Sequence, residues 1–164
     1  MGKTLPERKP TRMRAYSYSN VGYYFITICA ENKEKLFGTI VGGGAFDAPQ
    51  VQLSEIGKAL DESIKTTNRI SGVVVDKYVI MPNHLHLILI ITKNENNNRF
   101  DRANEMIPHA VGTLKRFVNR KAEKNVFQRS YHDHVIRGER DYKKIWSYID
   151  DNPRRWKDDC FYKD

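Results

Sequence analysis

The amino-acid sequence predicts an α+β protein in which helices pack on one antiparallel sheet. Two kinds of segment support this fold class: runs rich in β-branched and aromatic residues, and segments with apolar residues at helical spacing. Their order along the chain is strands, helix, strand pair, helix, strand, helix. The chain has 164 residues, a length typical of a single domain with a sizeable core.

The first half of the chain is expected to form two strands and a helix. Residues 22–30, GYYFITICA, are β-branched and aromatic and predict a strand. Residues 36–44, LFGTIVGGG, predict a second strand that runs into a glycine turn. Residues 53–70 predict an amphipathic helix with Ser54 as its N-cap. The apolar positions of this helix are Leu53, Ile56, Leu60 and Ile64.

The second half of the chain predicts three strands and two helices. Residues 72–81 and 84–91 read as two strands, separated by a turn at Pro82 and Asn83. A polar loop follows. The remaining elements are expected to be a helix over 108–124, a strand over 128–137 and a helix over 140–152 that Pro153 ends.

The strong positive charge is the main compositional clue to function. The net charge is +8 and the isoelectric point is near 9.5. Such an excess typically serves nucleic acid or another polyanion, although a basic surface that only confers solubility has the same composition. Residues 1–15 are expected to form a flexible basic arm, and residues 16–164 a single domain. The basic side chains of the arm are Lys3, Arg8, Lys9, Arg12 and Arg14.

Cysteine content and hydropathy predict a soluble cytoplasmic protein. Cys29 and Cys160 are too few for a disulfide framework and lack the spacing of metal ligands. The longest apolar run, residues 85–91, is far shorter than the roughly 20 residues that a membrane span requires. The N-terminus also lacks the apolar core of a signal peptide.

A pair of histidines begins one of the most apolar runs of the chain. His84 and His86 are two residues apart on a predicted strand, so they project from one face about 7 Å apart. Two imidazoles in this arrangement can bind one metal ion. Alternatively, both are half-exposed sheet residues with satisfied hydrogen bonds. His132 and His134 form a second such pair, and spacing alone does not separate the two.

Tyr148 is a candidate nucleophile because of the residue one helical turn beyond it. Asn152 lies four residues later, so on a helix the phenol and the amide share one face. This helix also has a packed side, which carries Ile145, Trp146 and Ile149. The alternative interpretation is that Tyr148 belongs to this packed side. A tyrosine hydroxyl has an ordinary pKa of about 10 and needs a nearby cation to act as a nucleophile at neutral pH.

Three motifs in this order resemble those of a known enzyme family. They are YVIMPNHLHLILI, the basic helix VGTLKRFVNRK, and FQRSYHDHVIRGERDYKKIWSYIDDNP. Together they resemble the single-tyrosine HUH transposases of the IS200 type, and most of all their domesticated branch, the REP-associated tyrosine transposases. The resemblance covers the chain from about Tyr23 to Asn152.

This resemblance implies a fold, a site and a reaction. The fold would be an RRM-like (ferredoxin-like) antiparallel sheet, with a C-terminal helix that carries the tyrosine. His84, His86 and Asn152 would bind a divalent ion, Mg²⁺ or Mn²⁺, and Tyr148 would be the nucleophile. The enzyme would cut single-stranded DNA next to a hairpin, keep the 5′ end as a phosphotyrosine and transfer the strand to a 3′-hydroxyl group.

The same resemblance implies the partners and the location of the protein. Its partner would be single-stranded or hairpin DNA, with no membrane contact. The protein would be bacterial, cytoplasmic and associated with the nucleoid. It would be a monomer, like the REP-associated branch, or a homodimer, like other IS200-type relatives. His132 and His134 would then be structural or would contact DNA.

Basic and aromatic residues of the second half are candidates for DNA contact. The predicted 108–124 helix carries several of them, although most charge runs are simply solvated helix faces. An aromatic ring could also stack on unpaired bases. The candidates are Lys115, Arg116, Arg120, Lys121, Arg129, Tyr131 and Arg137.

Two alternative functions stay open. The first is a non-catalytic nucleic-acid-binding module on an RRM-like sheet. The second is a phosphoesterase that uses both histidine pairs as acid and base. That chemistry usually requires Ser or Thr two residues beyond each His. In this chain the residue two positions after His84 is His86, and the residue two positions after His132 is His134. The phosphoesterase therefore ranks last.

Overall fold

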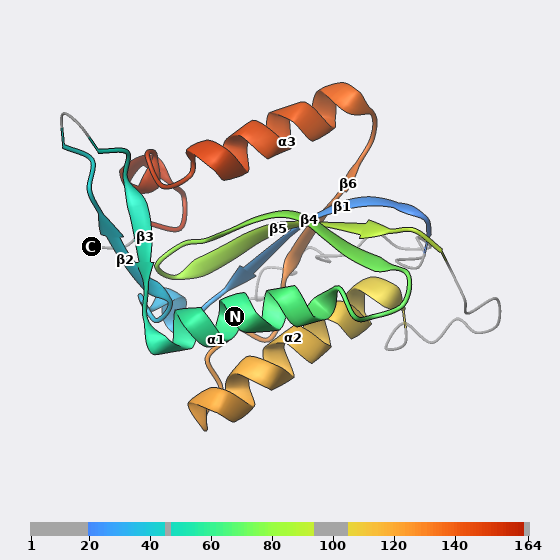
Figure 1. The fold of residues 1–164 in the computed structure, drawn as a ribbon, viewed down its shortest axis with the longest axis horizontal. Helices are drawn as coiled ribbons and strands as arrows, with labels where there is room; N and C mark the ends of the chain where they lie inside the picture. Colours follow the sequence, from blue (N-terminus) through green and yellow to red (C-terminus); the bar gives the residue numbers. More distant parts are fainter. Residues whose placement is uncertain (1–19, 45–46, 94–104, 163–164) are drawn as a thin grey trace, which may run out of the picture.

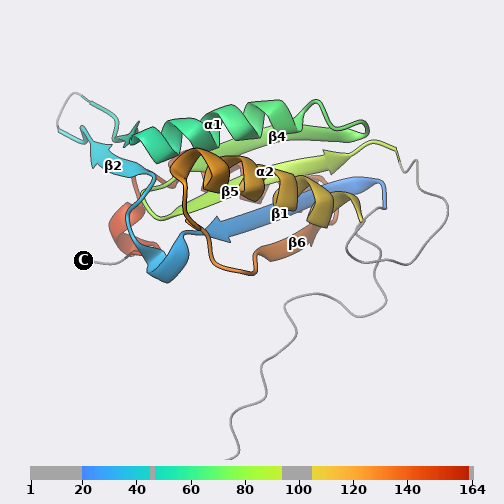
Figure 2. The ribbon, with the colours of Figure 1, turned by 90° about the horizontal axis from the view of Figure 1, so that it is seen from below.

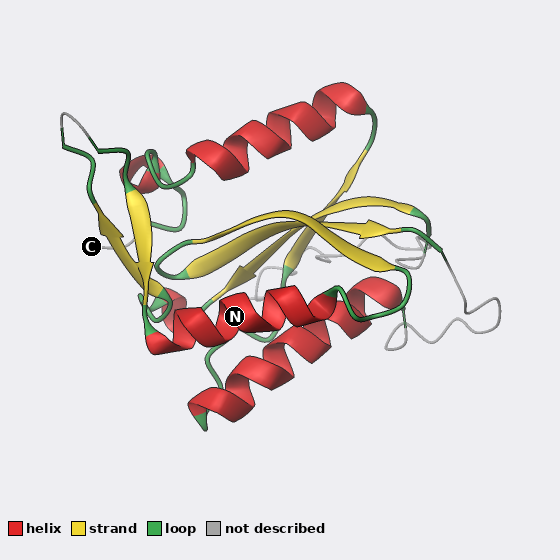
Figure 3. Ribbon diagram, in the orientation of Figure 1, coloured by secondary structure: helices red, strands yellow, loops and turns green. Residues whose placement is uncertain are grey.

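A computed structural model describes residues 20–44, 47–93 and 105–162. The predicted basic arm lies outside these residues. The described chain forms an antiparallel sheet (Figure 3) of four strands, in the order β4-β5-β1-β6. The strands are β1 (Gly22–Cys29), β4 (Val73–Ile80), β5 (His84–Ile91) and β6 (His132–Ile136).

Three helices cover the two faces of this sheet. α1 (Glu55–Thr67) and α2 (Met106–Ala122) lie together on one face, and α3 (Glu139–Asp151) lies on the other (Figure 1). Figure 2 shows α1 and α2 side by side across the strands. The four strands of this sheet and the helices α1 and α2 follow one another in the order βαββαβ, with β1 and β5 at the centre, which is the ferredoxin-like arrangement. The predicted α+β fold is therefore confirmed.

The alternation of side chains along β5 divides the core in two. Every second residue of this strand faces α1 and α2 in the larger cluster: Leu85, Leu87, Leu89 and Ile91. The opposite face of β5 carries His84, His86 and Ile88. Ile88 belongs to a smaller apolar cluster under α3, which holds that helix on the sheet. Both faces of β5 are thus covered, although by different elements.

A small hairpin stands beside the main sheet. It consists of β2 (Gly38–Val41) and β3 (Gln50–Leu53). Leu53, which the sequence predicted to be helical, ends β3 instead, and α1 begins at Glu55. The predicted N-cap is confirmed, because the Oγ of Ser54 accepts a hydrogen bond from the Gly57 N–H at 3.0 Å.

The predicted strand over 128–137 is shorter in the structure. β6 begins only at His132. The Nζ of Lys115 in α2 donates to the backbone carbonyls of Gln128 at 2.7 Å and Ser130 at 3.1 Å. The Gln128 N–H still donates to the carbonyl of Cys29 at the end of β1, at 3.0 Å. Because the carbonyls of Gln128 and Ser130 point at a helix and not at a neighbouring strand, the ladder of β6 does not extend back over these residues. Along the described chain, no helix is long and apolar enough to cross a membrane.

Gly57 marks the closest approach between α1 and the segment before β2. A Cβ atom at this position would lie 1.9 Å from the carbonyl oxygen of Phe37. Gly57→Ala should therefore destabilise the fold by more than about 2 kcal/mol in urea denaturation, because backbone must move. Gly112→Ala in α2 is the matched control, since its Cβ would meet only the flexible end of Arg116 at 3.2 Å. It should be neutral or stabilising by about 0.5 kcal/mol. Equal destabilisation by both changes would contradict this account.

Candidate active site

The two histidines of β5 are buried on the sheet face that α3 covers. His84 is 0% exposed and His86 is 1% exposed. Their rings lie with centroids 4.5 Å apart. The strand places both on one face, as the sequence predicted, but burial is complete and not partial. Such burial requires that each ring nitrogen be accounted for.

Neighbouring residues hold each ring by its Nδ1 atom. His84 Nδ1 lies 2.9 Å from the Oδ1 of Asn83, and His86 Nδ1 lies 2.8 Å from the Oγ1 of Thr27. The amide of Asn83 is itself fixed, because its Nδ2 donates to the carbonyls of Lys33 and Phe161. Its Oδ1 can only accept, so the proton of His84 is on Nδ1 and the lone pair is on Nε2.

The α3 helix brings Tyr148 to the same place. Its hydroxyl oxygen lies 3.3 Å from the Nε2 of His86 and 3.4 Å from the Oδ2 of Asp159. The ring packs edge-on against His86 and Phe25, with centroids 5.2 and 6.1 Å away. Tyr148 remains 36% exposed, so its side chain is held by these contacts and is still partly open to solvent.

Asp159 is a member of the site that the sequence did not reveal. It follows α3 and the short 3₁₀ helix at Trp156–Asp158. Its Oδ2 lies 3.8 Å from the Nε2 of His84. One ligand atom each from His84, His86 and Asp159 lies within 4.8 Å of the others, so this group could hold a metal ion. No spacing motif links Asp159 to the histidines, because only the fold of the C-terminal segment brings them together.

Asn152, the predicted third ligand, lies next to Asp159. Its Nδ2 donates to the Oδ2 of Asp159 at 3.2 Å. The Oδ1 of Asn152 and the Nε2 of His84 are buried and have no hydrogen-bond partner among the described residues. Two buried acceptors without donors are costly unless a cation or water meets them. The donor set therefore fits a divalent ion.

Burial determines the protonation of the site. Burial, and then the charge of Lys33, lowers the pKa of His84 to about 3. Burial, and then His84, lowers the pKa of His86 to about 3. Both imidazoles are thus neutral at pH 7, the state that binds metal. Burial and the Asp159 carboxylate raise the pKa of Tyr148 to about 12, so the phenol is protonated at neutral pH.

The C-terminal segment covers the histidines with aromatic rings. The rings of Phe161 and Trp156 lie 4.6 and 5.9 Å from that of His84, centroid to centroid. The carbonyl of Phe161 accepts the hydrogen bond from Asn83 at 2.8 Å. Asp159 is therefore held in a packed segment and not in a loose tail.

The second histidine pair lies apart from this group. His132 and His134 are exposed on β6. The Nε2 of His134 lies 2.8 Å from the Oδ2 of Asp141 at the start of α3. His132 is the register partner of Thr27, on the far side of β1 from His86. The structure thus separates the two pairs that spacing alone did not.

The predicted DNA-contact residues are divided between the two sides of the sheet. Arg116, Arg120 and Lys121 are exposed on α2, on the opposite face from Tyr148 (Figure 1). Arg129 and Arg137 are exposed at the two ends of the segment that contains β6.

Two other predicted DNA contacts have structural roles in the described chain. The ammonium of Lys115 binds the carbonyls of residues 128–130. The Tyr131 ring is only 6% exposed and belongs to the main core. Its face is therefore covered and does not offer a surface for base stacking.

Comparison with known proteins gives a relative and a structural neighbour. An uncharacterised protein of Haemophilus influenzae is 35% identical over 178 residues, covering 98% of this chain and 96% of that protein. A solved structure of a REP-associated tyrosine transposase bound to a REP hairpin matches with a TM-score of 0.62 and 20% identity. It covers 88% of this chain and 73% of that chain. No protein-family model matches the sequence.

The chain belongs to the same family as the Haemophilus influenzae protein, with which it aligns over nearly its full length. The similarity to the transposase structure shows that the two proteins share a fold. The sequence-based expectation of an α+β sheet with a C-terminal tyrosine helix is consistent with this neighbour.

The buried neutral histidines predict a pH-dependent stability. Their pKa values are lowered from 6.5 to about 3 on folding, so below about pH 6.5 the unfolded chain binds protons that the folded chain does not. The free energy of unfolding of the metal-free protein should fall by roughly 1 kcal/mol for each imidazole between about pH 6.5 and 5.5. Urea denaturation across this range measures it. The double variant His84→Gln, His86→Gln should show a flatter pH dependence, and an unchanged slope would contradict the assignment.

Proposed function

We propose that this protein is a metal-dependent single-stranded DNA endonuclease and strand transferase of the single-tyrosine HUH type, with Tyr148 as its nucleophile. The observation that carries the proposal is that β5, α3 and the C-terminal segment bring their side chains together at one place. The Tyr148 hydroxyl lies within 3.4 Å of both His86 and Asp159, beside the unpaired Nε2 of His84. A tyrosine that only packs α3 against the sheet requires none of these polar neighbours.

The proposed reaction exchanges one phosphodiester for another. The hydroxyl oxygen of Tyr148 attacks the scissile phosphorus, and the bond from phosphorus to the 3′ oxygen breaks. The 5′ end stays on the protein as a phosphotyrosine, while the 3′ oxygen leaves with a proton, which balances the one that the phenol loses. A 3′-hydroxyl group can later attack the phosphotyrosine and rejoin the strand. No external energy source is needed, because the number of ester bonds is unchanged.

The side chains of the site have separate tasks in this reaction. His86 and Asp159 orient the phenol by contacts at 3.3 and 3.4 Å. His84, His86 and Asp159, with the Oδ1 of Asn152 beside them, would hold the divalent ion, Mg²⁺ or Mn²⁺. When bound, the ion would stabilise the negative charge that develops on the phosphate and the phenolate. Asn83 and Thr27 fix the imidazoles from behind.

Hairpin DNA is the proposed substrate. The structurally similar transposase was solved with a REP hairpin, and the net charge of +8 suits a polyanionic partner. The exposed residues Arg116, Arg120, Lys121, Arg129 and Arg137 are proposed to contact its phosphates. A non-catalytic nucleic-acid-binding module would share the charge but would not need the buried acceptors at the site.

Tyr148→Phe tests the nucleophile. The variant loses one oxygen and keeps the ring that packs on Phe25 and His86. Hairpin binding should persist, while cleavage and the covalent protein–DNA adduct disappear together, a loss of at least about 1000-fold in rate. Denaturing electrophoresis of a labelled hairpin oligonucleotide with Mn²⁺ measures both. Tyr78→Phe is the control, because that hydroxyl binds Asp61 on the α1 side at 2.7 Å.

The outcome separates enzyme from binding module. Adduct formation by Tyr148→Phe at the rate of the unchanged protein would show that another residue is the nucleophile. Binding of hairpins without any adduct, by the unchanged protein in Mn²⁺ or Mg²⁺, would favour the non-catalytic module.

Metal affinity tests the ligand set. His84→Ala should weaken Mn²⁺ binding by at least about 100-fold, because it removes a nitrogen lone pair aimed into the site. Asp159→Asn should weaken it by at least about tenfold, more than Asn152→Ala does, because it removes a charged ligand. Isothermal titration calorimetry measures each. His132→Ala is the control from the other histidine pair, and an equal loss of affinity in this variant would show that the site has been placed wrongly.

A further inference from the structure

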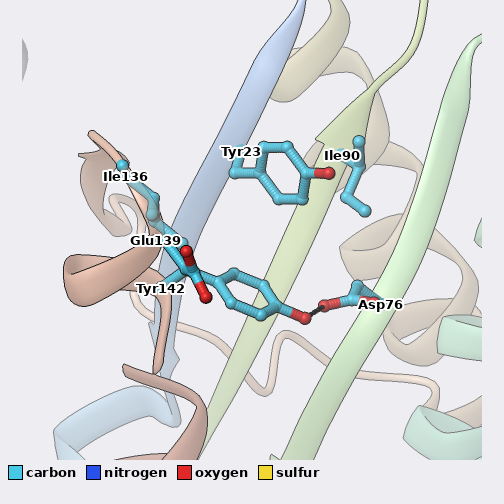
Figure 4. A pocket seen from close by; sticks show the side chains of 7 residues that line it. Tyr23, Asp76, Ile90, Ile136, Glu139 and Tyr142 are labelled. Atoms are coloured by element: carbon cyan, nitrogen blue, oxygen red, sulfur yellow. Dashed lines mark hydrogen bonds between the residues drawn. The ribbon is translucent and has the colours of Figure 1, made fainter. Parts of the chain in front are cut away.

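A hollow lies on the sheet face that α3 covers, at the opposite end of α3 from Tyr148. Its volume is about 430 Å³, within the range of small-molecule sites. None of the residues of the metal group lines it. The residues that line it are Tyr23, Asp76, Ile90, Ile136, Gly138, Glu139 and Tyr142, and Figure 4 shows their side chains around the opening.

Aromatic and apolar surface forms most of the hollow. The rings of Tyr23 and Tyr142 stand edge to face, with centroids 5.7 Å apart and an interplanar angle of 76°. Tyr23 is 44% exposed, although it is a large apolar side chain on a central strand. Ile90 and Ile136 provide further apolar surface beside the rings. An exposed ring beside apolar side chains is a surface on which a flat molecule can stack.

A carboxylate is fixed at one edge of this surface. Asp76 is the extra residue of a β-bulge in β4, since the register with β5 shifts between Val75 and Lys77. Bulges redirect side chains. The hydroxyl of Tyr142 donates to the Oδ2 of Asp76 at 2.6 Å (Figure 4), and this hydrogen bond raises the pKa of Tyr142 to about 12. Tyr142 therefore stays a donor and holds the carboxylate in place.

The chemistry of this edge selects among flat molecules. A carboxylate accepts hydrogen bonds and donates none when ionised. Guanine, adenine and cytosine carry exocyclic amino groups that can donate to it. Thymine lacks an amino group and presents carbonyl oxygens beside its single N–H donor. A base that stacks on the Tyr23 ring with its edge toward Asp76 is therefore favoured when it carries an amino group.

We propose that this hollow binds one unpaired, amino-bearing nucleobase of the DNA strand, stacked on Tyr23 and hydrogen-bonded to Asp76. The inference rests on the proposed function, because it takes single-stranded DNA as the ligand. It adds a base-reading subsite that is separate from the metal group and the nucleophile.

The distance between the hollow and Tyr148 suits one continuous strand. Ile90 lies four residues after His86 on β5, which is about 14 Å along a strand. Tyr142 lies six residues before Tyr148 on α3, which is about 9 Å along the helix axis. A strand attached at Tyr148 thus has to run only a short way along α3 to place a base in the hollow. Arg137 and Arg140 are exposed at this end of α3 and suit the phosphates of the DNA strand. Glu139, which also lines the hollow, is paired with Lys143.

Binding of a set of hairpin oligonucleotides tests the proposal. Each hairpin carries single-stranded flanks of thymine, in which a single guanine, adenine or cytosine is moved one position at a time. Affinity is measured without divalent metal, so cleavage does not intervene. One flank position should bind about tenfold more tightly with an amino-bearing base than with thymine. An abasic site at that position should also weaken binding, because stacking is lost.

Substitutions in the hollow should remove this one preference. Asp76→Asn should make thymine and the amino-bearing bases bind nearly equally at that position, without changing the effect of other positions. Tyr23→Ala should remove the abasic effect, whereas Tyr23→Phe should keep it, since the ring and not the hydroxyl is used. Asp150→Asn is the matched control: it removes an exposed carboxylate from α3 that pairs with Lys77 at 2.6 Å and should leave the preference intact.

The possible results separate this site from the proposed enzyme activity. If no flank position prefers an amino-bearing base while the Tyr148 adduct still forms, the base site is wrong and the enzyme stands. If the preference exists and depends on Asp76 but no adduct forms, the base site stands and the enzyme activity is wrong. A preference that survives Asp76→Asn and Tyr23→Ala would show that the base is read elsewhere.

Discussion

The two-residue alternation of β5 is the constraint on which the rest of the structure depends. One face of this strand supplies four aliphatic side chains to the core against α1 and α2, and the other supplies His84 and His86. The hydrophobic face fixes the register, because a shift by one residue would bury the imidazoles in the aliphatic core. The same burial that stabilises the fold therefore also fixes the position of the two histidines.

Burying polar groups at this site costs folding free energy, and this cost indicates which kind of ligand the site would bind. The two imidazoles are almost fully buried, and each has a hydrogen-bond partner at Nδ1. The Nε2 of His84 and the Oδ1 of Asn152 have none among the described residues. Folding by itself gains nothing from buried acceptors without donors. A divalent ion would satisfy both and would also offset the effect of burial on the Tyr148 hydroxyl.

Local sequence patterns predicted an element well where the residues of that element alone decide its structure. The helix start at Ser54 and the pairing of His84 with His86 on one strand face follow from spacing and capping alone. Predictions were less accurate where a distant side chain decides. Residues 128–131 alternate like a strand, yet Lys115 binds the carbonyls of residues 128–130, and β6 begins only at His132. Leu53 fits helical spacing but ends β3, where it pairs with Gly38 of β2.

By itself, the sequence determined the order of strands and helices, and with it the fold class. It also determined that His84 and His86 share one strand face and that Tyr148 and Asn152 lie one helical turn apart, because these pairs are only a few positions apart in one element. Only the tertiary structure decided that Tyr148 meets His86, that Asp159 joins them, and that His132 and His134 lie apart. These contacts join residues far apart in the chain. They are set by how α3 and the C-terminal segment pack on the sheet, which no local spacing records.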